Sequence, residues 1–506
     1  MTAEQFDVVI IGAGLSGVGT AHHLKTKHPS KRFVIFEARD AVGGTWDLFR
    51  YPGIRSDSDM FTLGYGFKPW RGPKAIAEGA SILSYIREAA EEGGLQRHLR
   101  LGNRVVHAAW SSTDARWTLT IERASDGAIS YATCRFVFTC TGYYNYDSGF
   151  TPEFPGLDQF MGQVVHPQAW PAELDYAGKR VVVIGSGATA VTLVPALAAK
   201  ASHVIMLQRT PTYVVSLPTR DRMVERLRAT LPAKLAYRLV RWRNVAISMF
   251  FYNLARRRPQ KTRARIEEMA RRQLGPDFDV ATHFSPPYQP WDQRLCIVPD
   301  GDLFKAIRNG RASVTTGRIS GFTETGLRLE SGGSVEADLV VTATGLRLQL
   351  LGGMTISVDG EPIDMSQKLT YRGCMYNGVP NLATAFGYTN ASWTLKCDLT
   401  ADYVCRLLRY MDRHGFDWCT PGRGADVPNP EPLLSFSSGY VTRSISTFPK
   451  QGPKTPWRVR QNYALDVMEL KLAPINDGVM AFHSRRPDRS RARAWRGTVE
   501  ASPIEA

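Results

Sequence analysis

Two glycine-rich turns are the features of this sequence whose residue types and spacing point most directly to chemistry. Residues 12–17 read GAGLSG, with Gly12, Gly14, Ser16 and Gly17, and residues 185–190 read GSGATA, with Gly185, Ser186, Gly187 and Thr189. Glycines in such a turn let the backbone approach a pyrophosphate, which then faces a helix N-terminus. One such turn alone is weak evidence. Two in one chain predict two bound dinucleotides and electron transfer between them.

The first turn belongs to a strand–turn–helix unit that also contains an acidic residue suited to bind ribose. An apolar run at 6–11 precedes the turn and is typical of a buried parallel strand. The next strand, 33–36, ends at Glu37, which lies 20 residues beyond Gly17. A carboxylate at this place accepts hydrogen bonds from ribose hydroxyls. The alternative is a plain strand, turn and helix without a ligand.

The second turn lacks such an acid. It follows an apolar strand at 180–184, and the next strand, 203–207, leads into Gln208, Arg209 and Thr210. A carboxylate there would repel a 2′-phosphate, whereas Arg209 would attract one. We therefore predict FAD at the first turn and NADPH at the second. The alternative for Arg209 is an ordinary solvated surface arginine.

Strands and helices must position these turns, and their pattern predicts an α/β protein with two Rossmann-like dinucleotide-binding domains. One domain binds FAD and the other NADPH, and the NADPH domain contains a helical insertion. Between the turns we expect a helix near 76–91 and strands near 104–111, 116–122 and 131–140. The predicted boundaries are 1–145 for the first part of the FAD domain, 146–164 for a linker, 165–345 for the NADPH domain with its insertion at 216–285, 346–485 for the second part of the FAD domain, and 486–506 for a basic, disordered tail.

The length of the chain and its cysteine content limit the classes of protein to which it can belong. The chain has 506 residues, enough for two to three domains. Its first strand begins too early for a signal peptide, and no apolar run reaches the ~18 residues of a membrane span. Seven cysteines without a Cys-x-x-Cys pair indicate a reduced cytoplasm, no structural disulfide, no metal site and no dithiol reductase.

The net charge of +16 is concentrated in one segment, 219–272, which contains sixteen Lys and Arg against four acids. An apolar stretch, 245–252, lies between its basic blocks. Such a segment can lie peripherally on the anionic inner face of a membrane, or it can be a solvated helical insertion that covers the active site. Nucleic acid is not an expected partner, because no recognition module is visible.

A long helical pattern follows residues 390–394 and ends at Gly415. A helix that starts near Thr394 can direct its positive end at a reduced flavin, whose pyrimidine ring is negatively charged. The alternative is an ordinary capped helix.

The segment between the two units contains the most specific local signature. It reads FMGQVVHPQAWP and has Phe160, Gly162, His166, Trp170 and Pro171 at fixed places. This pattern resembles the fingerprint Phe-x-Gly-x-x-x-His-x-x-x-Trp-Pro of the Baeyer–Villiger monooxygenases. By residue type alone, His166 is more typical of a hydrogen-bonded structural histidine. The resemblance implies that it couples domain movement to turnover without touching substrate.

The resemblance extends to about residue 485. Residues 43–59, 290–296 and 387–394 look like the ethionamide-activating monooxygenase subgroup of mycobacteria, within the FAD-containing class B flavoprotein monooxygenases. It implies that Ser16, Glu37, Gly44, Trp46 and Asp57 contact FAD, and that Arg55, Ser186, Gly187, Thr189, Arg209 and Thr210 hold NADP. It also implies that Arg294 stabilises a peroxyflavin, with Asp57 as its partner. By residue type alone, Arg294 is more typical of a structural ion pair.

Two further positions bear on specificity. Many relatives have a lysine before the catalytic arginine that binds the 2′-phosphate, and here Gln293 stands there, which leaves more of that role to Arg209. Trp457 resembles a tryptophan of a mobile loop near the substrate, although a packing role explains it equally well.

The resemblance implies a reaction. NADPH reduces FAD, the reduced flavin takes up O2 as a C4a-peroxide, and the peroxide inserts oxygen beside the carbonyl of a hydrophobic ketone to give an ester or lactone. Sulfide or thioamide oxidation at sulfur is a second expected activity. Two alternatives stay open: an S- or N-oxygenating flavin monooxygenase with little ketone activity, and a membrane-associated flavoprotein that senses NADPH or redox state without substrate turnover.

Overall fold

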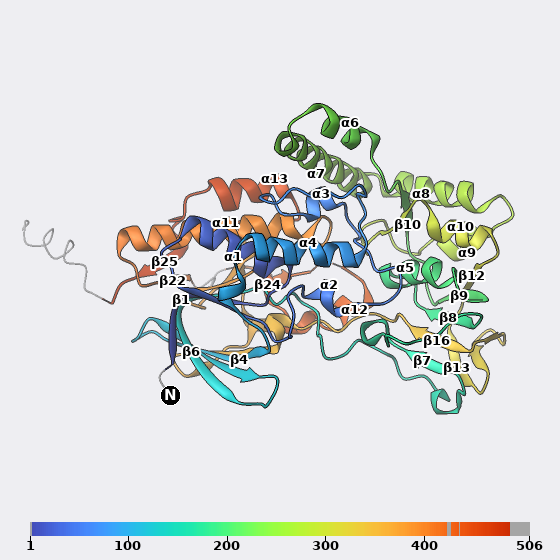
Figure 1. Cartoon of the computed structure of the whole chain (residues 1–506), viewed down its shortest axis with the longest axis horizontal. Coiled ribbons are helices and arrows are strands. Elements are labelled where there is room, and N and C mark those ends of the chain that lie inside the picture. Colours follow the sequence, from blue (N-terminus) through green and yellow to red (C-terminus); the bar gives the residue numbers. More distant parts are fainter. Residues whose placement is uncertain (1–2, 423–426, 435, 486–506) are drawn as a thin grey trace, which may run out of the picture.

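The computed structural model describes residues 3–422, 427–434 and 436–485. The basic tail predicted at 486–506 therefore lies outside the described residues. Figure 1 shows two sheets side by side, the larger at the left and the smaller at the right, with helices above them.

The larger sheet holds the first glycine-rich turn. Its members are β1 (Glu4–Ile11), β2 (Phe33–Phe36), β3 (Leu99–Arg100), β4 (Asn103–Ser111), β5 (Arg116–Arg123), β6 (Ile129–Thr139), β17 (Thr355–Val358), β18 (Glu361–Pro362) and β21 (Leu382–Thr384). The order is β18-β17-β4-β5-β6-β1-β2-β3, and β21 also pairs with β6. Strands β3, β2, β1, β6 and β21 run parallel, so their carboxyl ends meet at one edge.

The smaller sheet holds the second turn. It consists of β7 (Gln163–Val165), β8 (Arg180–Ile184), β9 (His203–Gln208), β12 (Ala312–Thr316) and β16 (Leu339–Thr342). The order is β12-β9-β8-β16-β7, and every pair is parallel. The linker predicted at 146–164 is shorter than expected, because β7 begins at Gln163 and pairs with β16. Phe154, Leu157 and Phe160 also pack on this unit, so much of that segment is part of its core.

Helices bury their apolar faces on the larger sheet. They are α1 (Leu15–Lys27), α4 (Gly79–Glu92) and α11 (Trp393–His414). Residues of α11 and α1 share one apolar core with β1 and β6. The predicted end of α11 is confirmed, because Gly415 follows it in the left-handed conformation with φ 68°. All seven cysteines are buried and unpaired.

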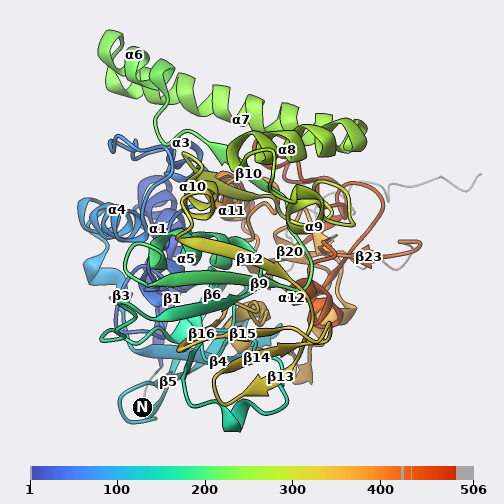
Figure 2. The same cartoon turned by 90° about the vertical axis from the view of Figure 1, so that its right-hand side faces the viewer.

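The predicted insertion is helical. After β10 (Val214–Leu217) come α6 (Arg222–Thr230), α7 (Ala233–Arg257), α8 (Pro259–Leu274) and α9 (Val280–Phe284), and β11 (Cys296–Pro299) returns to pair with β10. Helix α7 runs across the top of the molecule in both views (Figures 1 and 2). Among the helices of the described chain, none is long and apolar enough to cross a membrane.

Shorter elements connect these layers. The remaining helices are α2 (Thr45–Leu48), α3 (Met60–Leu63), α5 (Ala188–Leu197), α10 (Asp302–Arg308), α12 (Gly439–Thr442), α13 (Tyr463–Asp466) and the π-helix η7 (Val467–Leu472). The 3-10 helices are η1 (Gln96–His98), η2 (Leu157–Gln159), η3 (Pro167–Ala169), η4 (Leu350–Gly353), η5 (Met365–Gln367) and η6 (Ile445–Thr447). The remaining strands are β13 (Ile319–Thr323), β14 (Gly326–Leu329), β15 (Ser334–Glu336), β19 (Thr370–Tyr371), β20 (Met375–Tyr376), β22 (Trp418–Pro421), β23 (Glu431–Pro432), β24 (Lys450–Gln451) and β25 (Met480–His483).

A buried ion pair ties α13 to α11. Lys396 Nζ lies 2.9 Å from Asp466 Oδ2, and the two side chains are only 4% and 2% exposed. Tyr388 donates a further hydrogen bond of 2.5 Å to the same carboxylate. A buried pair of this kind adds little net stability when it is whole, but loss of one partner leaves the other charge buried and uncompensated.

We therefore predict that Lys396→Met lowers the free energy of unfolding by about 3–5 kcal/mol. Urea unfolding followed by circular dichroism measures the loss. The matched control is Asp126→Asn, which breaks the exposed pair with Arg123 and is expected to change stability by less than about 1 kcal/mol. Equal effects of the two substitutions would contradict the assignment of Lys396 as a buried structural charge.

Candidate active site

The first turn forms a backbone cradle that no side chain could share. Gly12 has φ +103°, and a Cβ on Gly17 would lie 1.8 Å from the Gly12 carbonyl oxygen. A Cβ on Gly44 would lie 2.9 Å from the Cα of Gly14, so a second segment approaches the same turn. This close approach of bare backbone is what a pyrophosphate site requires.

Glu37 is anchored to the first turn. Its carboxylate accepts hydrogen bonds from the backbone N–H of Ala13 at 2.6 Å and of Arg39 at 2.9 Å. Burial raises the pKa of Glu37, and the two N–H bonds offset this shift only in part. The acid predicted to bind ribose therefore lies within hydrogen-bond reach of the turn.

The second turn faces open space. A Cβ on Gly187 would meet nothing within 4 Å, whereas a Cβ on Gly185 would lie 2.4 Å from the carbonyl oxygen of Ala343. The hydroxyl of Ser186 donates a hydrogen bond of 2.9 Å to the carbonyl of Thr210. This bond joins the turn to the segment after β9, where Arg209 stands.

Arg209 has two cationic neighbours that the sequence does not reveal. Burial, and then repulsion from Arg347 and Arg209, lowers the pKa of Arg443. Arg443 lies 3.6 Å from the Phe150 ring centroid, and Arg347 donates to the carbonyl of Gly149. In the described part of the chain none of these three arginines has a carboxylate partner. They form an unneutralised cationic cluster beside the second turn.

The loop at 50–57 connects the two units. A Cβ on Gly53 would lie 2.7 Å from the Cβ of Ala196 on α5, so this loop packs closely on the second unit. Arg55, predicted to hold NADP, forms an ion pair with Asp302 at the start of α10. Its guanidinium is thus already bound to a carboxylate of the second unit.

The end of the same loop brings Asp57 to Arg294. Arg294 Nη2 lies 3.0 Å from Asp57 Oδ1. Burial acts against the charged guanidinium, but Asp57 and three tyrosines outweigh it and raise the pKa of Arg294 above its ordinary value. Strand β11 positions the arginine, because the N–H of Cys296 donates to the carbonyl of Tyr213 at 2.9 Å. The predicted ionic partners therefore lie together, with the arginine permanently charged.

Aromatic side chains surround this pair. Tyr143, Tyr144 and Tyr440 are the tyrosines that act on the pKa of Arg294. The ring of Tyr143 also stacks at 5.2 Å on Trp393, and Phe386 contacts both rings. Tyr143 and Tyr144 follow shortly after β6, at the carboxyl edge of the larger sheet, and this position is a sequence feature that could have identified them as site residues. No sequence feature identifies Tyr440 or Phe386.

The start of α11 contacts the first turn directly. The indole N–H of Trp393 donates to the Ser16 hydroxyl at 2.8 Å, and Ser392 and Thr62 share a hydrogen bond of 2.6 Å. Thr394, predicted to bind the flavin, uses its hydroxyl to donate to the carbonyl of Leu63 at 2.5 Å. Its side chain therefore holds the helix start in place, and the free polar groups there belong to the backbone.

The fingerprint residues lie on the second unit and not around Arg294. His166 accepts a hydrogen bond from Gln168 N–H, and its Nε2 lies 3.3 Å from the carbonyl of Gly345 at the end of β16. Burial lowers the pKa of His166 more than the Gly345 bond raises it, so the ring is neutral near pH 7. The ring of Phe160 contacts Phe322, and a Cβ on Gly162 would meet the Phe160 ring. Trp170 contacts Tyr176, and Pro171 is exposed.

Two predicted tryptophans pack on the core. Trp46 and Trp457 are partly buried against the core cluster of the larger sheet. Trp457 contacts Tyr371 at 5.8 Å, and within the described residues no ring contact or hydrogen bond links it to Arg294. Of the two interpretations of Trp457, packing is the one this geometry favours.

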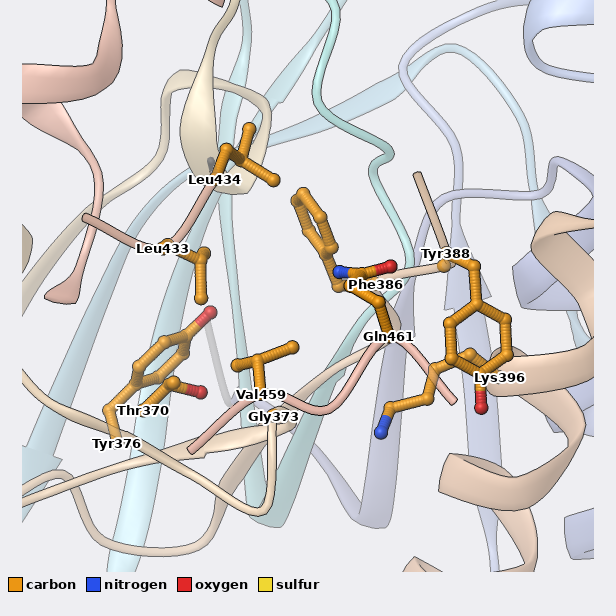
Figure 3. Close-up of a pocket in the computed structure, with 11 residues that line it drawn as sticks. Thr370, Gly373, Tyr376, Phe386, Tyr388, Lys396, Leu433, Leu434, Val459 and Gln461 are labelled. Carbon is orange, nitrogen blue, oxygen red and sulfur yellow. The ribbon is translucent and has the colours of Figure 1, made fainter. Parts of the chain in front are cut away.

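Two cavities lie near the start of α11. Phe386 of the aromatic cluster forms one wall of the first (Figure 3), which is lined by Thr370, Gly373, Tyr376, Phe386, Gly387, Tyr388, Lys396, Leu433, Leu434, Val459 and Gln461. The second lies between α7 and the start of α11, where Val245, Met249 and Tyr252 face Ser392 and Leu395. Helix α7 therefore lies opposite the start of α11 at this cavity.

Two nucleotide turns, each at the carboxyl edge of a parallel sheet, define a flavoprotein oxidoreductase of the two-dinucleotide class. The family described as flavin-binding monooxygenase-like matches residues 73–351, and a NAD(P)-binding Rossmann-like domain matches residues 10–75. The FAD-containing monooxygenase EthA of Mycolicibacterium smegmatis is 51% identical over 484 residues, which cover 96% of this chain and 98% of that relative. The chain belongs to the flavin-binding monooxygenase-like family.

Solved structures share the fold. An oxidized steroid monooxygenase bound to NADP aligns with TM-score 0.74 and 22% identity over 95% of this chain and 100% of that one. Cyclohexanone monooxygenase from Rhodococcus sp. Phi1 bound to NADP+ aligns with TM-score 0.73 and 20% identity over 96% and 100%. Together with the family match, these findings confirm the predicted fold class, the monooxygenase class and the cofactor pair of FAD and NADP(H).

The cationic cluster yields a prediction about cofactor choice. Arg209→Ala and Arg443→Ala should each raise the KM for NADPH about 10–100-fold, because a charge-assisted hydrogen bond contributes about 1.5–3 kcal/mol. The KM for NADH should change little. Steady-state kinetics with both nucleotides measure this, and Arg328→Ala, an exposed arginine of the same unit, is the control. Equal losses with NADH and NADPH would place the 2′-phosphate elsewhere.

Proposed function

We propose that this enzyme uses NADPH and O2 to insert oxygen beside the carbonyl of apolar ketones, which gives esters or lactones. The single observation that supports this reaction best is the Arg294–Asp57 pair within an aromatic cluster that contacts the first nucleotide turn. A permanent cation in such surroundings suits a reaction in which an anionic oxidant attacks a carbonyl.

The cofactor assignments follow from the cradles. We propose that FAD binds at Gly12, Gly14, Ser16, Gly17, Glu37, Gly44, Trp46, Asp57 and the backbone at Thr394. We propose that NADP(H) binds at Gly185, Ser186, Gly187, Thr189, Arg209 and Thr210, with Arg443 added and Arg55 contributing once its pair with Asp302 opens. When bound and reduced, the flavin supplies the electrons and the site of reaction with O2.

Arg294 performs two tasks in this proposal. Its guanidinium attracts the negative charge of the oxidant, and after attack on the ketone it donates hydrogen bonds to the new alkoxide oxygen. It does so without giving up a proton, because its pKa is raised further by Asp57. Asp57 orients the guanidinium and compensates its charge in a partly buried place.

The aromatic walls and the cavity behind Phe386 suit the apolar part of the substrate. Phe386, Leu433, Leu434 and Val459 give this cavity a largely apolar lining, and the one cation in it, Lys396, is neutralised by Asp466. A hydrocarbon chain or ring can exclude water there. Because the same walls accept a thioether or thioamide, we propose oxidation at sulfur as a second activity of the site.

His166 acts at a distance in this proposal. It holds Gly345, beside Arg443, and contacts neither Arg294 nor Asp57 through a hydrogen bond or ring contact among the described residues. In this proposal it fixes the segment after β16 within the second nucleotide unit.

The reaction is tested by separating NADPH oxidation from ester formation. Arg294→Ala should reduce ester formation from a long-chain 2-ketone at least about 100-fold, the loss typical of one oxyanion-stabilising donor. Flavin content should stay unchanged, and NADPH oxidation should continue with release of H2O2. Product analysis by gas chromatography, with H2O2 and NADPH measured in the same sample, gives the ratio.

The controls distinguish charge from geometry. Arg294→Lys keeps the charge but loses the planar fork, so we expect an intermediate loss. Arg328→Ala should leave the ester yield per NADPH unchanged. If the Arg294→Ala variant formed ester in full yield, Arg294 would have no role in the reaction. A native enzyme that oxidises a thioether but no ketone would replace the proposal with S-oxygenation.

A further inference from the structure

Helix α7 has an unusual distribution of side chains. A surface helix ordinarily buries its apolar stripe and exposes its charges. On α7 the inner face combines small apolar residues, such as Val240 and Val245, with polar ones. Arg241 donates to the carbonyls of Phe61, Thr62 and Gly64, and Asn244 donates to Asp59. The hydroxyl of Tyr237 donates to the carbonyl of Tyr65 on the same side.

The outer face of α7 is apolar. The exposed large side chains of α7 are Leu235 (45%), Leu239 (47%), Trp242 (53%), Ile247 (39%), Phe250 (63%) and Phe251 (60%). Leu235, Leu239, Trp242 and Phe250, together with exposed Ala246, are spaced by three or four residues and form one stripe about 22 Å long, whereas Ile247 and Phe251 lie to one side of it. We call this stripe the α7 outer face.

A second group of exposed apolar residues continues from it. Trp242 contacts Tyr463 at the start of α13 with 5.6 Å between ring centroids. Beyond that contact Leu465, Met468 and Leu472 are exposed. Figure 1 shows α13 on the same upper side of the molecule as α7. An apolar surface of this extent marks an interaction site.

Unpaired cations border the α7 outer face. Several acids of the insertion and its surroundings are already neutralised, with Asp221 on Arg243 and Asp292 on Arg256. Within the described chain these exposed basic residues have no ion pair: Arg222, Arg226, Lys234, Arg238, Arg257, Arg258, Lys261 and Arg265. The surroundings of the apolar stripe therefore carry an uncompensated positive charge.

We propose that the α7 outer face docks the enzyme onto an anionic lipid bilayer. Leu239, Trp242 and Phe250 enter the boundary between headgroups and acyl chains, and the flanking arginines and lysines bind lipid phosphates. A second copy of the chain is a poorer occupant, because two rows of unpaired cations would face each other. The proposal does not depend on the substrate of the enzyme.

The test uses the full-length, FAD-loaded enzyme and sedimentation with vesicles. Vesicles of phosphatidylcholine with phosphatidylglycerol should bind the enzyme at low salt, and pure phosphatidylcholine should bind it at least about tenfold more weakly. High salt should weaken binding to the anionic vesicles without abolishing it, because apolar burial is not screened. Failure to bind anionic vesicles at low salt overturns the proposal.

Variants locate the surface. The triple substitution Leu239→Ser, Trp242→Ser and Phe250→Ser should weaken binding at least about 30-fold, since each side chain loses apolar burial. The matched control is Ile129→Ser, Tyr131→Ser and Met161→Ser, which changes three exposed apolar residues outside the insertion and should leave binding unchanged. Flavin content reports folding of both variants. Equal binding of the triple variant and the native enzyme, or a native dimer that the triple variant dissociates, overturns the proposal.

Discussion

The ion pair between Arg294 and Asp57 is the contact on which the candidate active site depends. Its two members come from segments that belong to different nucleotide units. Asp57 ends a loop that packs on α5, and Arg294 stands two residues before β11. A charge held in this way costs desolvation, which the paired carboxylate offsets. The pair thus fixes a permanent cation between the two nucleotide units.

In our proposal the remaining architecture brings two dinucleotides to that cation. Parallel strands place both glycine-rich turns at carboxyl edges, where a bare backbone can approach phosphate. Helix α11 reaches the first turn through Trp393 and Ser16, which links the aromatic cluster to the cradle. The insertion places α7 beside this region, and Arg241 on the inner side of α7 donates to backbone carbonyls.

Local sequence patterns predicted much of this arrangement, because glycine turns, strand periodicity and helix ends depend on neighbouring residues. The two turns, Glu37 and the helix ending at Gly415 are of this kind. The cationic cluster could not be predicted, because Arg209, Arg347 and Arg443 are distant in sequence and meet only in the fold. The bonds that engage Arg55 and Thr394 are tertiary for the same reason. Composition indicated a basic and apolar insertion, but only packing shows which face of α7 is outward.

The most direct test of the central claim is to follow the NADPH-reduced enzyme by stopped-flow absorbance as oxygen is added, with and without a long-chain 2-ketone. The account predicts a transient absorbance that the ketone removes faster, with ester in the same sample. A transient that ignores the ketone, or the appearance of H2O2 alone, would contradict the assignment of Arg294 and Asp57 to ketone oxygenation.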